Sequence, residues 1–169
     1  MDFGFTIWIL FLLLFIIPQF NHWMTQRNRQ TQLNSFATDR QSNVITMIHR
    51  QERVSFFGIP FYKYIDIDDS EAVLRAIRKT PDEKPIDLII HTPGGLVLPA
   101  TQIALALQDH PAETRILIPH YAMSGGTLLA LACDRIIMDP HAVLGPVDPQ
   151  IGDYKGGTKA ASSILSVVD

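Results

Sequence analysis

Two glycine-containing loops, about one βαβ unit apart, constrain the fold of this chain more than any other feature. The first, His91 to Gly95, ends one apolar run, and the second, Tyr121 to Gly126, follows the next. The residues between them predict a strand at Ile86 to Ile90, a helix at Leu98 to Gln108 and a strand at Arg115 to Pro119. A crossover of this kind makes the two strands parallel neighbours about 4.8 Å apart, so both loops should meet at the same carboxyl edge of the sheet.

That edge would place a hydroxyl beside bare backbone amides. Ser124 lies in the second loop, and Gly94 and Gly95 close the first. Acyl transfer needs a nucleophile beside donors aimed at the developing oxyanion, and glycine can turn its N–H outward without a Cβ in the way. The two loops together therefore indicate a serine acyl hydrolase.

A purely structural interpretation of both loops is the alternative. Serine is among the best helix N-cap residues, and diglycine often marks only a tight turn. The apolar run Thr127 to Cys133 predicts a buried helix directly after Ser124, which favours the catalytic interpretation. The loop is not the G-x-S-x-G elbow of α/β-hydrolases, because Ala122 occupies the position of the first glycine.

The stretch from Ile65 through Asp153 resembles the serine dehydrogenase proteinase family, membrane-associated relatives of the Clp protease proteolytic subunit and of signal peptide peptidase A. Three segments carry the resemblance: His91 to Gly95, Pro119 to Thr127 and Asp139 to Gln150. The resemblance implies an α/β domain of the ClpP/crotonase-like fold with repeated βα units, and the activity of a serine-type endopeptidase. It also implies that Ser124 is the nucleophile and that the N–H groups of Gly95 and Gly125 form the oxyanion hole.

The resemblance leaves open which base activates Ser124. In the Clp-type triad a histidine follows the nucleophile, and the matching position here is Gly145, which argues against that triad. Relatives of signal peptide peptidase A use a downstream lysine, which must be neutral and therefore buried to accept a proton. Lys155 and Lys159 are the only lysines after the serine, in a Gly-rich stretch that we expect to be a polar loop. We prefer a lysine, with Lys159 as the first candidate and Lys155 or a residue beyond Asp169 as the others.

A histidine is the other candidate base. A Ser, Asp, His order has been attributed to the serine dehydrogenase proteinases, and His141 is the only histidine after the nucleophile. Its carboxylate partner would come from three residues: Asp134, Asp139 and Asp148. His91 and His120 directly precede the loops and are as well suited to a structural as to a catalytic role. Three further histidines are not expected at the site: His22, His49 and His110.

The start of the chain predicts a membrane anchor. Phe3 to Phe20 contains no charged side chain, and at 1.5 Å per residue it spans roughly 27 Å as a helix, enough for a thin hydrocarbon core. A cleaved signal peptide is the competing interpretation. Asp2 stands where a signal peptide carries Lys or Arg, and no A-x-A-like site follows Pro18, so we expect residues 1–24 to be an uncleaved transmembrane anchor.

The charges that flank the anchor predict its orientation. Arg27, Arg29 and Arg40 follow it, whereas only an aspartate precedes it, so the positive-inside rule places the later residues in the cytoplasm. The single Cys133 fits a reducing compartment. Residues 25–42 are rich in polar side chains and predict a stalk, and residues 43–169 predict the protease domain. That domain has no stop signal at its apolar end, so we expect it to continue beyond Asp169.

The remaining residues predict further elements of the domain. Two β-rich runs, Val44 to His49 and Phe56 to Tyr64, are expected to be its first strands, paired with each other. Asp68 to Glu71 predicts a helix start, and Thr80 to Pro85 ends that helix. Ile86 to Ile90 is almost wholly apolar, as expected of a central parallel strand covered on both faces. Two further short strands are expected: Arg135 to Met138 and Ala142 to Leu144.

Composition excludes several other classes of function. The net charge of −3 gives no basic surface for nucleic acid, and no His, Cys or carboxylate residues have metal-ligand spacing. Gly94 and Gly95 lack the Lys-Ser/Thr of a phosphate loop, so we expect no cofactor. The expected partners are a peptide or protein substrate, the membrane and further copies of the chain. Two alternatives stay open, namely a non-catalytic membrane scaffold of the same fold and a crotonase-type acyl-CoA enzyme.

Overall fold

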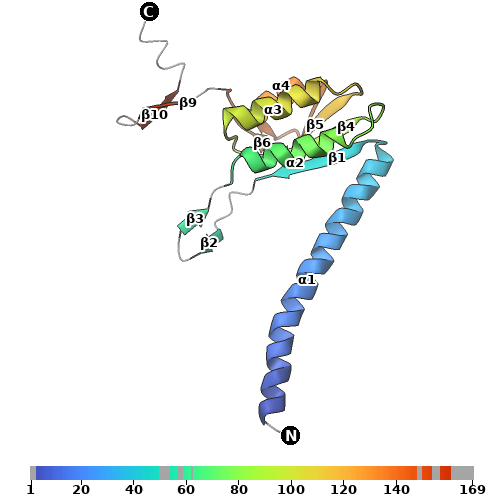
Figure 1. Cartoon of the computed structure of the whole chain (residues 1–169), viewed down its shortest axis with the longest axis vertical. Helices are drawn as coiled ribbons and strands as arrows, with labels where there is room; N and C mark the ends of the chain where they lie inside the picture. The colour runs from blue at the N-terminus through green and yellow to red at the C-terminus, as the bar shows by residue number, and fades with distance from the viewer. Residues whose placement is uncertain are drawn as a thin grey trace, which may run out of the picture. The chain divides into compact units, whose positions relative to one another are not determined.

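The computed structural model of the chain describes residues 3–49, 54–56, 59–61, 63–147, 150–153 and 157–160. The chain forms two compact units, Met1–Gln41 and Ser42–Asp169 (Figure 1). The first is helical, and the second is an α/β domain built on a parallel sheet.

The first unit is one continuous helix, α1 (Phe3–Asp39), which runs through both the predicted anchor and the predicted stalk. Pro18 lies inside the helix, where it has no N–H for the backbone hydrogen bond of that turn. The large apolar side chains from Trp8 to Met24 are exposed, and Trp8–Asp39 is long and apolar enough to cross a membrane, judged by length and composition. Farther along, polar side chains bond to the helix itself, as when Thr31 Oγ1 donates to the Arg27 carbonyl at 3.0 Å.

The second unit is built on a sheet of four parallel strands in the order β1-β4-β5-β7. The strands are β1 (Asn43–Ile48), β4 (Ile86–His91), β5 (Thr114–Ile118) and β7 (Arg135–Met138). Three helices accompany them: α2 (Ile67–Arg78), α3 (Val97–Gln108) and α4 (Gly125–Ala132). Because β4 and β5 are parallel neighbours joined through α3, the βαβ unit predicted between the two loops is confirmed.

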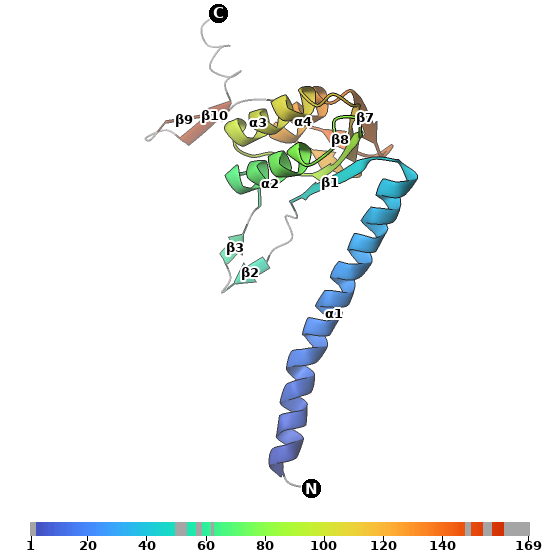
Figure 2. The same cartoon turned by 45° about the vertical axis from the view of Figure 1, so that its right-hand side comes forward.

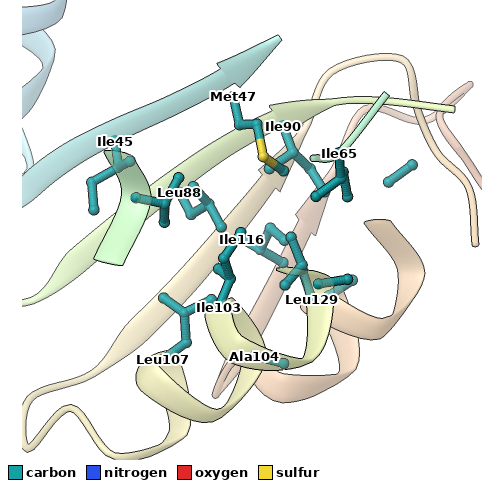
Figure 3. Close-up of a cluster of buried hydrophobic side chains, with 14 of the residues drawn as sticks. Ile45, Met47, Ile65, Leu88, Ile90, Ile103, Ala104, Leu107, Ile116 and Leu129 are labelled. Carbon is teal, nitrogen blue, oxygen red and sulfur yellow. The ribbon is translucent and has the colours of Figure 1, made fainter. Parts of the chain in front are cut away.

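The three helices lie on one face of the sheet, as the two views show (Figures 1 and 2). The side chains of β1 alternate accordingly, since Ile45 and Met47 are buried while Thr46 and Ile48 are exposed. The buried set continues from the central strands to the helices (Figure 3) and includes Leu88, Ile90, Ile103, Leu107, Ile116 and Leu129. Each such side chain contributes about 1.5–3 kcal/mol when fully buried. This core fixes the carboxyl ends of β4 and β5 side by side.

Two expectations about the strands are wrong. β1 pairs with β4 and not with residues 56–64, which instead overlap a short hairpin of β2 (Val54–Phe56) and β3 (Ile59–Phe61). The outer face of β4 is also less covered than expected, because Ile89 and His91 are only half-buried. The other described strands form two small pairs: β6 (Tyr121–Ala122) with β8 (Val143–Leu144), and β9 (Gln150–Asp153) with β10 (Gly157–Ala160).

β4 also carries a buried carboxylate that its apolar pattern does not explain. Asp87 is fully buried, and its Oδ1 lies 2.7 Å from Arg115 Nε on the neighbouring strand. Its Oδ2 accepts a hydrogen bond of 2.6 Å from Ser42 Oγ. A buried charge is tolerated when it is paired and hydrogen-bonded in this way. The group ties the first residue of the domain to the amino ends of β4 and β5.

Candidate active site

The two predicted loops meet at the carboxyl edge of the sheet. The Thr92 amide donates to the Tyr121 carbonyl at 3.2 Å, and the Met123 amide donates to the Thr92 carbonyl at 3.0 Å. Gly94 lies against the serine, because a Cβ built on it would stand 2.7 Å from Ser124 Cβ. Its φ of +102° is one that glycine adopts readily. The first loop therefore contacts the predicted nucleophile through bare backbone.

Ser124 has an unusual backbone conformation. Its φ is +50° and its ψ is −115°, outside the regions that side chains with a Cβ normally occupy. Although it is the N-cap residue of α4, its hydroxyl makes no capping hydrogen bond within the described chain. The carbonyl of Ser124 accepts from the amides of Thr127 and Leu128. A strained serine that does not cap its helix is better explained by a chemical role than by the structural alternative.

Gly95 and Gly125 stand next to each other beside the serine. Gly95 forms a parallel bridge with Ile65, in which the Ile65 amide donates to the Gly94 carbonyl at 2.8 Å and the Leu96 amide to the Ile65 carbonyl at 2.9 Å. This ladder does not use the Gly95 amide, whose nitrogen lies 3.8 Å from the point where a Cβ on Gly125 would stand. The two glycines to which the resemblance assigns the oxyanion hole are thus neighbours.

A small apolar cavity of about 50 Å³ opens at this point. Its lining is Gly95, Val97, Ala100, Ser124, Gly125, Leu128 and Val147. All lining side chains except Ser124 are apolar, or absent in the glycines, so the cavity suits an aliphatic group beside the serine.

Gly145, the position that matches the Clp-type histidine, lies in contact with Met123. Its amide donates to the Ala122 carbonyl at 3.0 Å, and its carbonyl accepts from Thr127 Oγ1 at 2.7 Å. A Cβ built on Gly145 would collide with the sulfur of Met123. A histidine at this position would require the Met123 side chain to move.

Among the described residues, neither Asp134 nor Asp139 makes a hydrogen bond to Ser124. His141 lies in an exposed turn, where its amide donates to the Asp139 carboxylate at 2.9 Å. Asp134 Oδ2 accepts from the Thr114 amide at 2.7 Å and from its hydroxyl at 3.0 Å, and these bonds lower the pKa of the carboxyl. Since Thr114 begins β5 and the Ser124 loop follows its end, Asp134 lies at the opposite edge of the sheet.

The predicted lysines are only partly covered by the structure. Lys159 lies on β10, in a hairpin and not in the polar loop that the sequence suggested. Lys155 and Asp148 fall outside the described residues. The identity of the base therefore stays a prediction.

His91 and His120 form an aromatic cluster with Tyr121 at the same edge of the sheet. The two imidazole rings stack with centroids 5.4 Å apart and planes 7° apart, and the Tyr121 ring lies 4.2 Å from His91. The described residues contain no group of three or more His, Cys, Asp or Glu side chains suited to a metal ion.

Cys133, at the end of α4, is a poor nucleophile. Its burial raises the pKa of the thiol to about 11. A thiol with that pKa is almost entirely protonated at neutral pH, and the thiolate is the reactive form.

The sequence interpretation was wrong about His49. This side chain is buried directly behind the first loop, where Nδ1 lies 2.8 Å from Thr92 Oγ1 and Nε2 lies 3.0 Å from Asp69 Oδ2. The three residues are far apart in the sequence, and the only local signal is a histidine that ends an apolar run. A histidine at the end of a predicted strand would therefore have been the sequence feature that indicated this position.

A family model for ClpP-like SDH-type serine proteinases matches residues 2–169. Two proteins of Methanocaldococcus jannaschii are similar to the chain. Uncharacterized protein MJ0137 is 58% identical over 173 residues, which are 96% of this chain and 60% of that protein. Uncharacterized protein MJ1495 is 52% identical over 179 residues, which are 100% of this chain and 61% of that protein. The chain thus spans less than two thirds of the length of these curated relatives.

A solved structure is similar as well. It is a mutant of the 1510-N membrane-bound stomatin-specific protease, with a TM-score of 0.55 and 19% sequence identity, and the match covers 74% of this chain and 56% of that chain. At this level of identity the likeness shows the fold alone. It agrees with the parallel α/β arrangement that carries the two loops.

Proposed function

This chain belongs to the ClpP-like SDH-type serine proteinase family, and from that premise we propose that it is a membrane-anchored serine-type endopeptidase acting through an acyl-enzyme on Ser124. One observation carries the proposal. Ser124 has a strained backbone, its hydroxyl makes no capping hydrogen bond to α4 within the described chain, and the residue lies against Gly94. The neighbouring amides of Gly95 and Gly125 support an oxyanion hole. Labelling of Ser124 by a fluorophosphonate probe tests the assignment.

The geometry suggests how the reaction runs. An extended peptide binds across the edge of the sheet, and Ser124 Oγ attacks its carbonyl carbon while a base accepts the hydroxyl proton. The carbonyl oxygen becomes the oxyanion, which the Gly95 and Gly125 amides stabilise. Collapse of this intermediate releases the amine, which takes up a proton, and leaves an ester on Ser124. Water then hydrolyses the ester and restores the hydroxyl.

We propose that the base is a lysine, with Lys159 as the first candidate, Lys155 or a residue beyond Asp169 as alternatives, and His141 as the competing base. A lysine must lose its proton to act, so activity should rise toward alkaline pH, and Lys159→Ala or Lys155→Ala should be inactive while His141→Ala retains turnover. If a histidine serves, the acidic limb should lie in the ordinary range of an imidazole, about 6.5. An inactive His141→Ala with unchanged melting temperature, beside active lysine variants, would overturn the lysine assignment.

The small cavity predicts the substrate side chain next to the cleaved bond. We propose that this side chain is small and aliphatic, because the cavity of about 50 Å³ is lined by the apolar side chains of Val97, Ala100 and Leu128. Leu128→Ala should enlarge it and raise the kcat/KM for a phenylalanine peptide, relative to an alanine peptide, by about tenfold. Leu131→Ala is the matched control, since Leu131 is on the same helix but 66% exposed. If the two variants have the same ratio of kcat/KM for the phenylalanine and alanine peptides, the cavity does not select the substrate side chain.

We propose that α1 anchors the protein in a membrane, with the domain in the cytoplasm, and that copies of the chain associate. Exposed apolar side chains along α1 support the anchor, and exposed Ile136 and Ile137 on the edge strand β7 support association. Full-length protein should stay in the membrane pellet after alkaline carbonate extraction. Light scattering of the detergent-solubilised protein should give more than one copy. Release by carbonate would contradict the membrane anchor. A monomer in detergent would contradict the association of copies.

A further inference from the structure

A buried histidine holds the first loop from behind. His49 follows β1 and is 3% exposed. Its amide donates to the His91 carbonyl at 2.7 Å, so the residue sits next to the end of β4. Its ring nitrogens face two partners: Nδ1 lies 2.8 Å from Thr92 Oγ1, and Nε2 lies 3.0 Å from the Asp69 carboxylate.

Thr92 connects this ring to the glycine loop. The Gly94 amide donates to Thr92 Oγ1 at 3.1 Å. The same oxygen lies 2.8 Å from His49 Nδ1 and 3.3 Å from the Gly94 carbonyl oxygen, so the contact with His49 is the shorter one. The contacts therefore link the Gly94 amide to the Asp69 carboxylate through the side chains of Thr92 and His49.

The far end of this chain is fixed as well. Asp69 belongs to the capping box of α2, in which its Oδ2 accepts from the Asp66 amide at 3.1 Å and its own amide donates to Asp66 Oδ1 at 3.0 Å. The carboxylate is therefore held at the start of a helix. Buried groups that are fully hydrogen-bonded in this way make a site rigid.

We propose that His49 and Asp69 are positioning residues, which fix the Gly94–Gly95 loop through Thr92 so that the Gly95 amide faces the reacting carbonyl. This inference rests on the proposed role of Ser124. Glycine has no side chain to hold a loop, and an oxyanion hole works only when its donors are already in place. His49 and Asp69 hold the donors of the oxyanion hole in place without touching the substrate.

Thr92 allows a matched test in the full-length protein. Thr92→Val replaces the hydroxyl by a methyl group of similar size, and Thr92→Ser keeps the hydroxyl. Thr92→Val should lower kcat about tenfold to a hundredfold with KM within about twofold, as misplacement of a catalytic group does, and Thr92→Ser should stay near the wild type. Equal kcat values for the two variants would overturn the inference.

Asp69 provides a second pair of variants. Asp69→Ala removes the partner of His49 and part of the cap of α2, whereas Asp66→Ala weakens the same cap and leaves the His49 contact. Both should lower the melting temperature, but only Asp69→Ala should lower kcat, by about tenfold. A similar loss of kcat in Asp66→Ala would mean that Asp69 acts only through the helix.

A readout without turnover separates this inference from the proposed function. Hydrogen exchange of the peptide spanning residues 92–96 should quicken in Thr92→Val, and not in Thr92→Ser, even in a Ser124→Ala background. That result together with an unreactive Ser124 would refute the protease assignment and keep the loop assignment. Unchanged exchange in Thr92→Val would refute the loop assignment itself.

Discussion

Ser124→Ala should abolish fluorophosphonate labelling and lower peptide hydrolysis by a factor on the order of ten thousand or more. The reason is that the variant keeps the backbone amides but has no atom that can form the acyl-enzyme. Removing the Oγ leaves α4 intact, because the hydroxyl makes no capping hydrogen bond in the described chain. The melting temperature should therefore change little, and gel-based labelling beside a thermal melt is the measurement.

Ser70→Ala is the control for this experiment. Ser70 is buried, and its hydroxyl donates to the Ile67 carbonyl at 2.9 Å within α2. It should keep full labelling. Labelling that survives Ser124→Ala would mean that another residue is the nucleophile. A folded wild type that is never labelled would favour the non-catalytic scaffold, and calorimetric binding of a CoA thioester would favour the acyl-CoA alternative.

Gly95→Ala should lose both activity and stability. A Cβ on Gly95 would collide with the backbone nitrogen and oxygen of Ile65, so the bridge between the two residues must open. We expect a loss of about 1–3 kcal/mol in the free energy of unfolding, typical of overpacking at a site that cannot relax. The Gly95 amide would move with the bridge, and losing one oxyanion donor costs a hundredfold or more in kcat. Urea unfolding and steady-state kinetics measure the two effects.

Gly125→Ala is the matched comparison. A Cβ there would stand 3.0 Å from Ala100 Cβ and 3.4 Å from Ile65 Cδ1. Ile65 Cδ1 can turn away, and Ala100 needs to move by only a few tenths of an ångström. The expected loss of stability is about 1 kcal/mol, smaller than for Gly95→Ala. Activity should fall by about tenfold, because the methyl group narrows the cavity beside the serine. Similar stability losses in both variants would mean that the Ile65 bridge is not what fixes Gly95.

The meeting of the two loops could be predicted from the sequence because it depends on local patterns. Apolar strands, a helix of the right spacing and the rule for crossover connections are sufficient to place the ends of β4 and β5 together. The partner of β1 could not be predicted in the same way. The residues of a strand indicate which of its faces is buried, but they do not identify the strand that pairs with it.

The contacts between buried polar groups also could not be predicted from the sequence. His49 and Thr92 are 43 positions apart, and Ser42 and Asp87 are 45 apart. Such contacts exist only after the fold has formed, and a single sequence carries no periodic signal for them. The sequence indicated that Gly95 needs to be a glycine, but it could not show that the backbone of Ile65 leaves no room for a Cβ there.

The contact between Gly145 and Met123 has a consequence for how this site could change. A histidine at position 145 would meet the Met123 sulfur, so the Met123 side chain would have to turn away before a Clp-type base could fit there. Met123 directly precedes Ser124, so this change would repack the residue beside the predicted nucleophile. We therefore expect substitutions at positions 123 and 145 to depend on each other.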